Sequence, residues 1–332
     1  MTLLATLPGH DPAAPALAVS GLHVRLGRTG IVHGVDYAVE PGRTLAVLGE
    51  SGSGKSVTAR AVMGLIRPPT GAVTAGSVRL RGVDLLTLPE ETRRRLRATT
   101  IAMVFQDALS ALNPVLSVGY QIAELFRAHL GLSRKEAHRR AVEVLDLVRI
   151  PAAARRARDY PHQFSGGMRQ RVGIGLAIAL NPQVIIADEP TTALDVTVQA
   201  QILRLLGEIQ REHGTALVLI THDMGVVADV ADRVAVMYAG RVVEQGGAAE
   251  LYARPAHPYT EALLGAIPRP QLRGQRLAVI PGAPPDPADP DPGCRFRPRC
   301  GYGTDACDQA PAALQIAAGR LAACHEWERV TA

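Results

Sequence analysis

The sequence predicts an α/β fold built on a parallel sheet, with a smaller antiparallel sheet, an inserted group of helices and a cysteine-containing C-terminal extension. Three observations predict it. Short apolar runs alternate with amphipathic stretches up to Gly246, a glycine-rich loop directly follows one of these runs, and proline and glycine become frequent afterwards. With 332 residues, 47% of them apolar and 20% charged, the chain can bury a sizeable core.

Five short apolar runs are predicted to form strands of the sheet. The first four lack the alternation of polar and apolar residues that marks a half-exposed strand, so we expect burial on both faces. Helical patterns lie between the runs, and strands separated by helices form βαβ units with parallel strands. The predicted strands are 44–49, 101–106, 183–188, 216–222 and 233–240, and the predicted helices are 55–65, 89–97, 117–130, 134–149, 167–180 and 196–212.

Further segments predict the parts added to this sheet. Residues 17–26, 30–42 and 75–86 have the patterns of short strands, and we expect them to form a small antiparallel sheet beside the core. Residues 107–170 contain several helical patterns and no convincing strand. Because this is too long for a simple crossover, we interpret it as an inserted helical subdomain.

These patterns divide the chain into three parts. We expect a disordered leader over 1–16, a main domain over 17–250 and a C-terminal extension over 251–332, in which the proline-rich 281–293 is a linker or a wrapped arm. The leader lacks the pattern of a signal peptide, and no apolar run approaches the roughly 20 residues that cross a bilayer. A cytosolic protein, peripheral if it works at a membrane, is therefore expected. The net charge of +5 is mildly basic and suits an anionic ligand or a membrane surface.

The stretch "GESGSGKS" matches the pattern G-x-x-x-x-G-K-[ST] through Gly49, Gly54, Lys55 and Ser56. A predicted strand precedes it and a predicted helix follows it, which is the context that the pattern requires. Glycines let backbone N–H groups converge on phosphate oxygens, and the helix N-terminus adds its positive dipole end. Lys55 would reach the β- and γ-phosphates, and Ser56 would bind Mg²⁺. The predicted nucleotide-binding residues are Gly49, Ser51, Gly52, Ser53, Gly54, Lys55, Ser56 and Val57.

Polar residues follow three other predicted strands at the same edge of the sheet. Asp188 ends the run "VIIAD", where its carboxylate would lie near Mg²⁺, since ligands of open α/β sheets gather at the carboxyl ends of the strands. Glu189 follows and could orient or deprotonate an attacking water. Gln106 and His222 end two more strands. Either alone would be a polar strand end, but together they indicate a shared site.

The segment "QFSGGMRQRVGIGLAIAL" (163–180) resembles the signature of ABC-type ATPases, and the order of motifs along 17–250 is similar to that family. The resemblance implies an ABC-type P-loop ATPase fold with a RecA-like parallel-sheet core. It implies that ATP is hydrolysed with Mg²⁺ held by Ser56, Gln106 and Asp188, and that the catalytic residues are Glu189, Gln106 and the switch His222. It also implies that Ser165, Gly166, Gly167 and the D-loop Asp195 contact ATP bound to a second ATPase subunit.

A narrower resemblance extends to the C-terminus. "YPHQFSGGMRQRV" (160–172), "HPYTEALLGAIP" (257–268) and "CRFRPRC" (294–300) look like the ATP-binding subunits of bacterial dipeptide and oligopeptide importers. This implies a paralogous ATPase subunit in a heterodimer, two transmembrane permease subunits, an extracytoplasmic solute-binding protein and a peripheral location at the cytoplasmic face of the inner membrane. Related importers carry nickel complexes or glutathione instead. A non-transport ABC ATPase acting on nucleic acid is the rival class, and it usually has coiled-coil insertions or two cassettes, so no nucleic-acid partner is expected.

The position that stacks on adenine in this family falls at Leu26, where most relatives have an aromatic residue. Leu26 could pack against the base by apolar contact, without the aromatic-face interaction. Tyr37 is the alternative, but it lies too close to the phosphate-binding stretch and is interpreted as sheet core.

All four cysteines lie in the extension with the spacing C-x₅-C-x₆-C-x₁₆-C: Cys294, Cys300, Cys307 and Cys324. Disulfides would need an oxidising compartment. Structural zinc sites usually contain a C-x₂₋₄-C pair, which is absent, whereas a [4Fe–4S] cluster tolerates wider spacing. Some peptide-importer ATPases that resemble this chain carry such a cluster. The [4Fe–4S] cluster is therefore the first hypothesis, and the alternatives are Zn²⁺ or an arm that is empty or disulfide-bonded.

Overall fold

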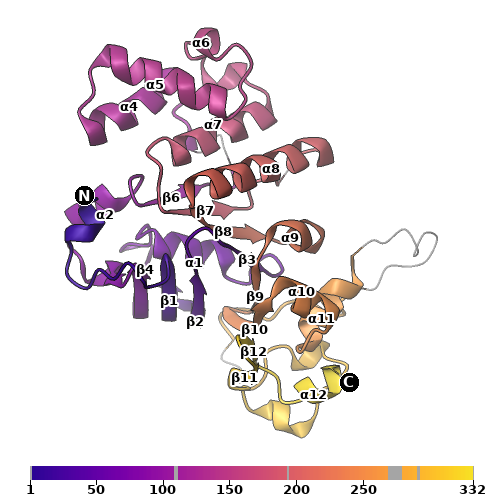
Figure 1. The fold of residues 1–332 in the computed structure, drawn as a ribbon. Helices are drawn as coiled ribbons and strands as arrows, with labels where there is room; N and C mark the ends of the chain where they lie inside the picture. Colours follow the sequence, from indigo (N-terminus) through magenta and orange to yellow (C-terminus); the bar gives the residue numbers. More distant parts are fainter. Residues whose placement is uncertain (1, 108–110, 193, 268–278, 290–291, 332) are drawn as a thin grey trace. The chain divides into compact units, whose positions relative to one another are not determined.

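The computed structural model describes residues 2–107, 111–192, 194–267, 279–289 and 292–331 (Figure 1). The chain forms two compact units, and each is assembled from separate stretches of sequence. The first unit consists of Met1–Leu17, Val39–Arg43 and Arg79–Ile220, and the second of Ala18–Ala38, Thr44–Val78 and Thr221–Ala332.

A parallel sheet lies at the centre of the first unit. Strand β7 (Val184–Asp188) pairs with β6 (Ile101–Val104) on one side and with β8 (Ala216–Thr221) on the other, both in parallel. Every residue of the three strands is buried. This confirms the strands that the continuous apolar runs predict, because a strand covered on both faces has no polar side to alternate with.

Helices make up most of the rest of the first unit, and the described residues between β6 and β7 contain no strand. Helices α4 and α5 are joined by Gly131, which adopts the left-handed conformation (φ +66°), and Ser133 caps α5 by accepting a hydrogen bond from the Glu136 N–H (3.3 Å). The elements are η1 (Leu3–Thr6), β5 (Val83–Asp84), η2 (Leu85–Thr87), α2 (Glu90–Leu96), α4 (Val118–Leu130), α5 (Arg134–Leu147), α6 (Ala153–Arg156), η3 (Pro161–Gln163), α7 (Gly166–Ile178) and α8 (Val196–His213).

The N-terminal leader differs from the sequence prediction of disorder. Leu4, in η1, is fully buried. The Arg81 guanidinium donates hydrogen bonds to the backbone oxygens of Pro12 (2.6 Å) and Ala14 (3.1 Å), and the Asp11 N–H donates to the Arg81 carbonyl (2.9 Å). The leader is therefore held in place by a residue that lies about 70 positions later in the chain.

The second unit contains strands of two sheets. Strands β2 (Thr29–Val39), β1 (Leu17–Leu26) and β4 (Gly71–Leu80) lie in that order, and most of their residues belong to this unit. Strand β3 (Thr44–Leu48) pairs in parallel with β9 (Arg233–Tyr238), which continues through antiparallel pairs to three further strands. These are β10 (Arg241–Gly247), β12 (Arg320–Ala322) and β11 (Leu314–Ala317).

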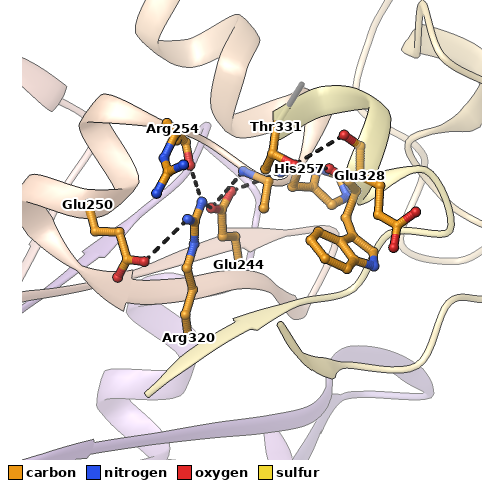
Figure 2. A network of polar contacts seen from close by, with 9 residues as sticks. Glu244, Glu250, Arg254, His257, Arg320, Glu328 and Thr331 are labelled. Carbon is orange, nitrogen blue, oxygen red and sulfur yellow. Dashed lines mark hydrogen bonds and ion pairs between the residues drawn. The ribbon is translucent and has the colours of Figure 1, made fainter. Parts of the chain in front are cut away.

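The C-terminal extension is packed into the second unit. Phe296 shares a buried core with β3 and β9, and β12 hydrogen-bonds to β10. The fully buried Glu244 carboxylate accepts hydrogen bonds from the Ala256 and His257 N–H groups (2.8 and 3.0 Å). It also accepts a hydrogen bond from Arg320 (3.2 Å), as Figure 2 shows. The helices of this unit are α1 (Lys55–Val62), α9 (Met224–Val230), α10 (Ala248–Ala253), α11 (Pro258–Gly265), η5 (Arg297–Arg299), η6 (Asp305–Asp308) and α12 (Trp327–Thr331).

Candidate active site

The loop after β3 has the backbone shape that its glycines predict. We call residues 49–56 the phosphate loop. Gly49 has φ +152°, and a Cβ there would lie 2.2 Å from the Met237 carbonyl oxygen, so no larger residue fits. Gly54 has φ +97° and precedes the first residue of α1, Lys55. These positions turn the chain from a buried strand into a helix whose first N–H groups face the loop.

The interior of the phosphate loop is lined by polar groups. The Lys55 side chain is only 5% exposed, and its Nζ donates hydrogen bonds to the carbonyl oxygens of Gly49 (2.7 Å) and Glu50 (2.9 Å). The Oγ of the buried Ser53 has no hydrogen-bond partner within the described chain and lines a pocket together with Ser51 and Gly52. A cationic side chain and an unsatisfied hydroxyl in a loop of N–H groups fit a bound polyphosphate.

The first unit positions the predicted catalytic carboxylate. Asp188, 2% exposed, is the last residue of β7 and pairs in register with Ile220 of β8. Glu189 follows in a left-handed conformation (φ +45°), and its N–H donates to the Ile220 carbonyl (2.9 Å). The bend turns the Glu189 side chain away from the strand direction, so that it is only partly buried.

Two side chains hold the Glu189 carboxylate. Gln106 Nε2 donates a hydrogen bond to Glu189 Oε2 (2.9 Å), and Thr192 Oγ1 donates to the same oxygen (2.8 Å). The structure therefore joins two of the predicted site residues directly. Thr192 was not predicted, although it lies three residues after Glu189 in the segment that the sequence singles out. A carboxylate fixed in this way is suited to orient a water molecule.

The signature segment begins helix α7. Ser165 is the N-cap, and its Oγ accepts a hydrogen bond from the Met168 N–H (3.4 Å). A Cβ on Gly167 would lie 2.7 Å from Val198 Cγ1 on α8, so packing between these helices requires glycine there. Asp195 caps α8 by accepting from the Val198 N–H (3.0 Å). Ser165, Gly166 and Asp195 are exposed, so the segment is accessible to a ligand carried by another chain.

The remaining predicted nucleotide contacts lie in the second unit. His222 is exposed and comes directly after the last residue of β8. Leu26 ends β1 and is half-buried. Tyr37 is 4% exposed in β2, and burial raises the pKa of its hydroxyl, which agrees with its interpretation as sheet core. The adenine contact of Leu26 stays a prediction.

The predicted residues thus fall into two groups, one in each unit. Gln106, Asp188, Glu189, the signature segment and Asp195 belong to the first unit. The phosphate loop, Leu26, His222 and the four cysteines belong to the second.

The four cysteines lie in one region of the second unit as free thiols. The Tyr302 N–H donates to Cys300 Sγ (3.3 Å), and the Glu326 N–H donates to Cys324 Sγ (3.4 Å). Burial, with a smaller contribution from the other three cysteines nearby, raises the pKa of the Cys324 thiol to about 12. No group of three or more Cys, His, Asp or Glu side chains among the described residues is arranged to hold a metal ion. The donor types fit a four-thiolate site, whereas the described positions of the sulfurs do not form a closed one.

Two contacts to the phosphate loop come from the C-terminal extension and were missed from the sequence. The Glu50 N–H donates a hydrogen bond to the hydroxyl oxygen of Tyr259 (2.7 Å) in α11, and the Glu50 carboxylate pairs with Arg299. The available signals were the tyrosine in "HPYTEALL" and the last of the three arginines in "CRFRPRC". Neither indicates what the side chain contacts.

His257 holds the helix that carries Tyr259. Its Nδ1 accepts a hydrogen bond from the Tyr259 N–H (3.0 Å) and thereby caps α11. The side chain is 2% exposed, and burial lowers its pKa from 6.5 to about 3. Protonation would place a buried charge and remove the acceptor of the cap.

Acid should therefore destabilise the protein through His257. Below pH 6.5 the His257 imidazole takes up a proton in the unfolded chain but stays neutral in the folded one. The free energy of unfolding therefore decreases as the pH falls from 6.5 toward 3. At pH 5 the loss should be about 2 kcal/mol of unfolding free energy. Denaturant unfolding at pH 7.5 and pH 5 measures it. His257→Asn retains a cap acceptor and should reduce the difference, whereas His138→Asn, at an exposed site of α5, should not. An unchanged pH dependence in His257→Asn would contradict this assignment.

Comparisons with known proteins agree with these features. The family model described as ABC transporter matches residues 32–192, and the model described as oligopeptide/dipeptide transporter, C-terminal region, matches residues 243–307. A peptide import ATP-binding protein of Brucella melitensis is 47% identical over 96% of this chain and 99% of its own length. The oligopeptide transport ATP-binding protein OppD of Salmonella typhimurium is 46% identical over 95% of this chain and 94% of its own. The dipeptide transport ATP-binding protein DppD of Bacillus subtilis is 48% identical over 88% of this chain and 89% of its own length.

Solved structures are similar to this chain as well. An ATP-binding cassette in a dimeric, post-hydrolysis state bound to ADP and phosphate has a TM-score of 0.62 and 27% identity, and the match covers 70% of this chain and 98% of that one. The same cassette in another dimeric structure has a TM-score of 0.63 and 28% identity. Among the described residues, no helix is long and apolar enough to cross a membrane.

Proposed function

The chain belongs to the ATP-binding subunits of ABC transporters, in the group with the oligopeptide/dipeptide C-terminal region, and we propose that it hydrolyses ATP to energise the import of peptides through a membrane permease. The observation that carries the proposal is the carboxylate of Glu189, held by Gln106 directly after the buried Asp188. The peptide substrate is supported by relatives of nearly the full length, whose names specify peptide, oligopeptide or dipeptide transport.

The residues take the following roles in this proposal. The phosphate loop binds the phosphates through its N–H groups and Lys55. Ser56, Gln106 and Asp188 would hold Mg²⁺, which neutralises charge on the phosphates. Glu189 orients the attacking water and accepts its proton, while His222 contacts the γ-phosphate. Leu26 packs against adenine. Ser165, Gly166, Gly167 and Asp195 contact ATP bound to the second subunit, where the N-terminus of α7 faces the γ-phosphate.

The proposed assembly is a heterodimer of this chain with a paralogous ATPase subunit. It docks through its helical subdomain on two transmembrane permease subunits, at the cytoplasmic face of the inner membrane, and an extracytoplasmic solute-binding protein delivers the peptide. This is supported by the exposure of Ser165, Gly166 and Asp195 and by the named relatives.

Uptake measurements test the transport function. Cells that lack this gene should lose uptake of a labelled dipeptide or tripeptide, and a plasmid copy should restore it. Uptake of a nickel complex or of glutathione in the same cells decides between the solute classes. Unimpaired peptide uptake with loss of nickel or glutathione uptake would replace the proposed substrate. A tagged chain that copurifies with an untagged copy of itself, and with no second ATPase, would contradict the heterodimer.

We further propose that Cys294, Cys300, Cys307 and Cys324 hold a [4Fe–4S] cluster as thiolates, with Zn²⁺ as the alternative. This is supported by their gathering in one region and by the backbone N–H groups that donate to two of the sulfurs, a pattern that stabilises thiolates. The contribution of such a group would be structural, since it would tie together an arm with few core residues of its own.

Replacement of Cys300 by serine should remove this group. Protein purified without oxygen should contain about four iron and four sulfide per chain and absorb visible light, and Cys300→Ser should lose most of both. Metal analysis and visible absorption measure the change. Arg297→Ala, a variant of the same arm that retains all four thiols, is the control. Colourless protein with about one zinc per chain would decide for zinc.

A further inference from the structure

A part-buried ion pair links the cysteine arm to the phosphate loop. We define the cysteine arm as residues 294–324. Arg299, immediately before Cys300, donates from Nη1 to Glu50 Oε2 (2.7 Å) and from Nη2 to Glu50 Oε1 (3.0 Å). Glu50 is the second residue of the phosphate loop and lies 249 positions earlier in the chain. Two parallel N–H···O bonds fix both the distance and the orientation of the carboxylate.

The surroundings of Arg299 make this contact different from a surface ion pair. Its side chain is 4% exposed, while that of Glu50 is 28% exposed. Two further donors of the guanidinium are also used, since Nε donates to the Pro281 carbonyl (2.8 Å) and Nη1 donates to the Tyr238 hydroxyl (3.3 Å). The guanidinium lies against the rings of Tyr238 and Phe296. A buried cation fixed by these hydrogen bonds and ring contacts can hold the less buried Glu50 carboxylate in one orientation.

The phosphate loop receives a second contact from the same part of the chain. The Glu50 N–H donates to Tyr259 Oη (2.7 Å), so one residue of the loop is held at its backbone and at its carboxylate. Pro284, Pro285 and Arg295 line the same pocket as Ser51, Gly52 and Ser53. The extension therefore forms one wall beside the phosphate loop.

We propose that Arg299 is a positioning residue for ATP binding. Through Glu50 it holds the phosphate loop in the shape that receives the phosphates, so that ATP affinity depends on the folded state of the cysteine arm. Arg299 contacts the loop and not the nucleotide. The inference rests on the proposed role of residues 49–56 as the phosphate loop.

The test compares matched variants of the full-length chain by equilibrium binding of the non-hydrolysable analogue AMP-PNP with Mg²⁺, and by ATPase kinetics. Arg299→Ala leaves the Glu50 carboxylate without its partner and should raise the Kd at least about tenfold. The KM for ATP should rise with it, while kcat at saturating ATP changes less than about threefold. Arg299→Lys retains the charge but cannot form two parallel hydrogen bonds to the carboxylate. Its Kd should therefore lie between those of wild type and Arg299→Ala.

Two further variants separate positioning from a general loss of the arm. Glu50→Gln leaves the arm unchanged in sequence and should weaken binding as Arg299→Ala does, and the double variant should be no worse than either single one. Arg297→Ala lies in the same arm but removes ion pairs with Asp305 and Asp308, which belong to the arm itself, so it should bind as wild type. Thermal unfolding and the reactivity of the four thiols report whether the arm is folded.

Several results would overturn the inference: Arg299→Ala with a Kd within about twofold of wild type, equal losses in Arg297→Ala and Arg299→Ala, or additive losses in the double variant. Lys55→Ala distinguishes failure of the inference from failure of the proposed function. If Lys55→Ala loses AMP-PNP binding and Arg299→Ala does not, only the positioning role is wrong. If neither loses it, residues 49–56 do not bind the phosphates.

Discussion

Replacing Glu189 by glutamine is expected to lower ATP turnover by at least about a hundredfold while leaving nucleotide binding nearly unchanged. Glutamine has the size of glutamate and can still accept the hydrogen bonds that Gln106 and Thr192 donate to this position. It cannot accept a proton from the attacking water. The variant should therefore bind ATP and retain it, and a dimer closed on ATP should accumulate because the step that opens it is lost.

Phosphate release and AMP-PNP binding by the full-length chain measure the two effects. The matched control is Glu208→Gln, which removes another carboxylate of the first unit. Glu208 lies on α8 and forms a surface ion pair with Arg149 (2.7 Å). This control should keep wild-type turnover, because an exposed ion pair contributes little. Wild-type phosphate release by Glu189→Gln would remove Glu189 from the mechanism and would leave its contact with Gln106 as a structural one.

The parts of the fold that local rules determine could be predicted from the sequence. The run "VIIAD" has no polar alternation, and β7 is buried on both faces as that pattern requires. The glycines at 49 and 54 adopt positive φ, as the phosphate-loop pattern predicts. The hydrogen bond between Gln106 and Glu189 agrees with the expectation of a shared site, because parallel strands bring their carboxyl ends to one edge.

The contacts that depend on distant parts of the chain could not be predicted. The leader has the composition of a disordered segment, yet Arg81 holds it through backbone oxygens, and any sequence offers such oxygens. The pairing of Arg299 with Glu50 spans 249 positions. Composition shows that arginine and glutamate are present, but only the path of the extension past β9 brings these two together.

The cysteines show a different limit. Their number and their spacing are properties of the sequence, and these suggest thiolate chemistry. Whether a cluster, a zinc ion or no metal follows depends on where four sulfur atoms lie in space. Among the described residues the four sulfurs share one region without forming a closed ligand group, and metal analysis of the protein distinguishes the three outcomes.

Replacing Lys55 by alanine is expected to weaken AMP-PNP binding by about a hundredfold, because a charge-assisted contact to the phosphates is lost. Lys55 Nζ already lies among the carbonyl oxygens of the phosphate loop, and its side chain is 5% exposed. Lys55→Arg should not restore binding, since the larger planar guanidinium does not fit a space shaped for an ammonium group. The chain has one other lysine, Lys135, exposed on α5, so Lys135→Ala is the matched control and should bind as wild type. Equal affinities in Lys55→Ala and Lys135→Ala would show that the phosphates bind elsewhere.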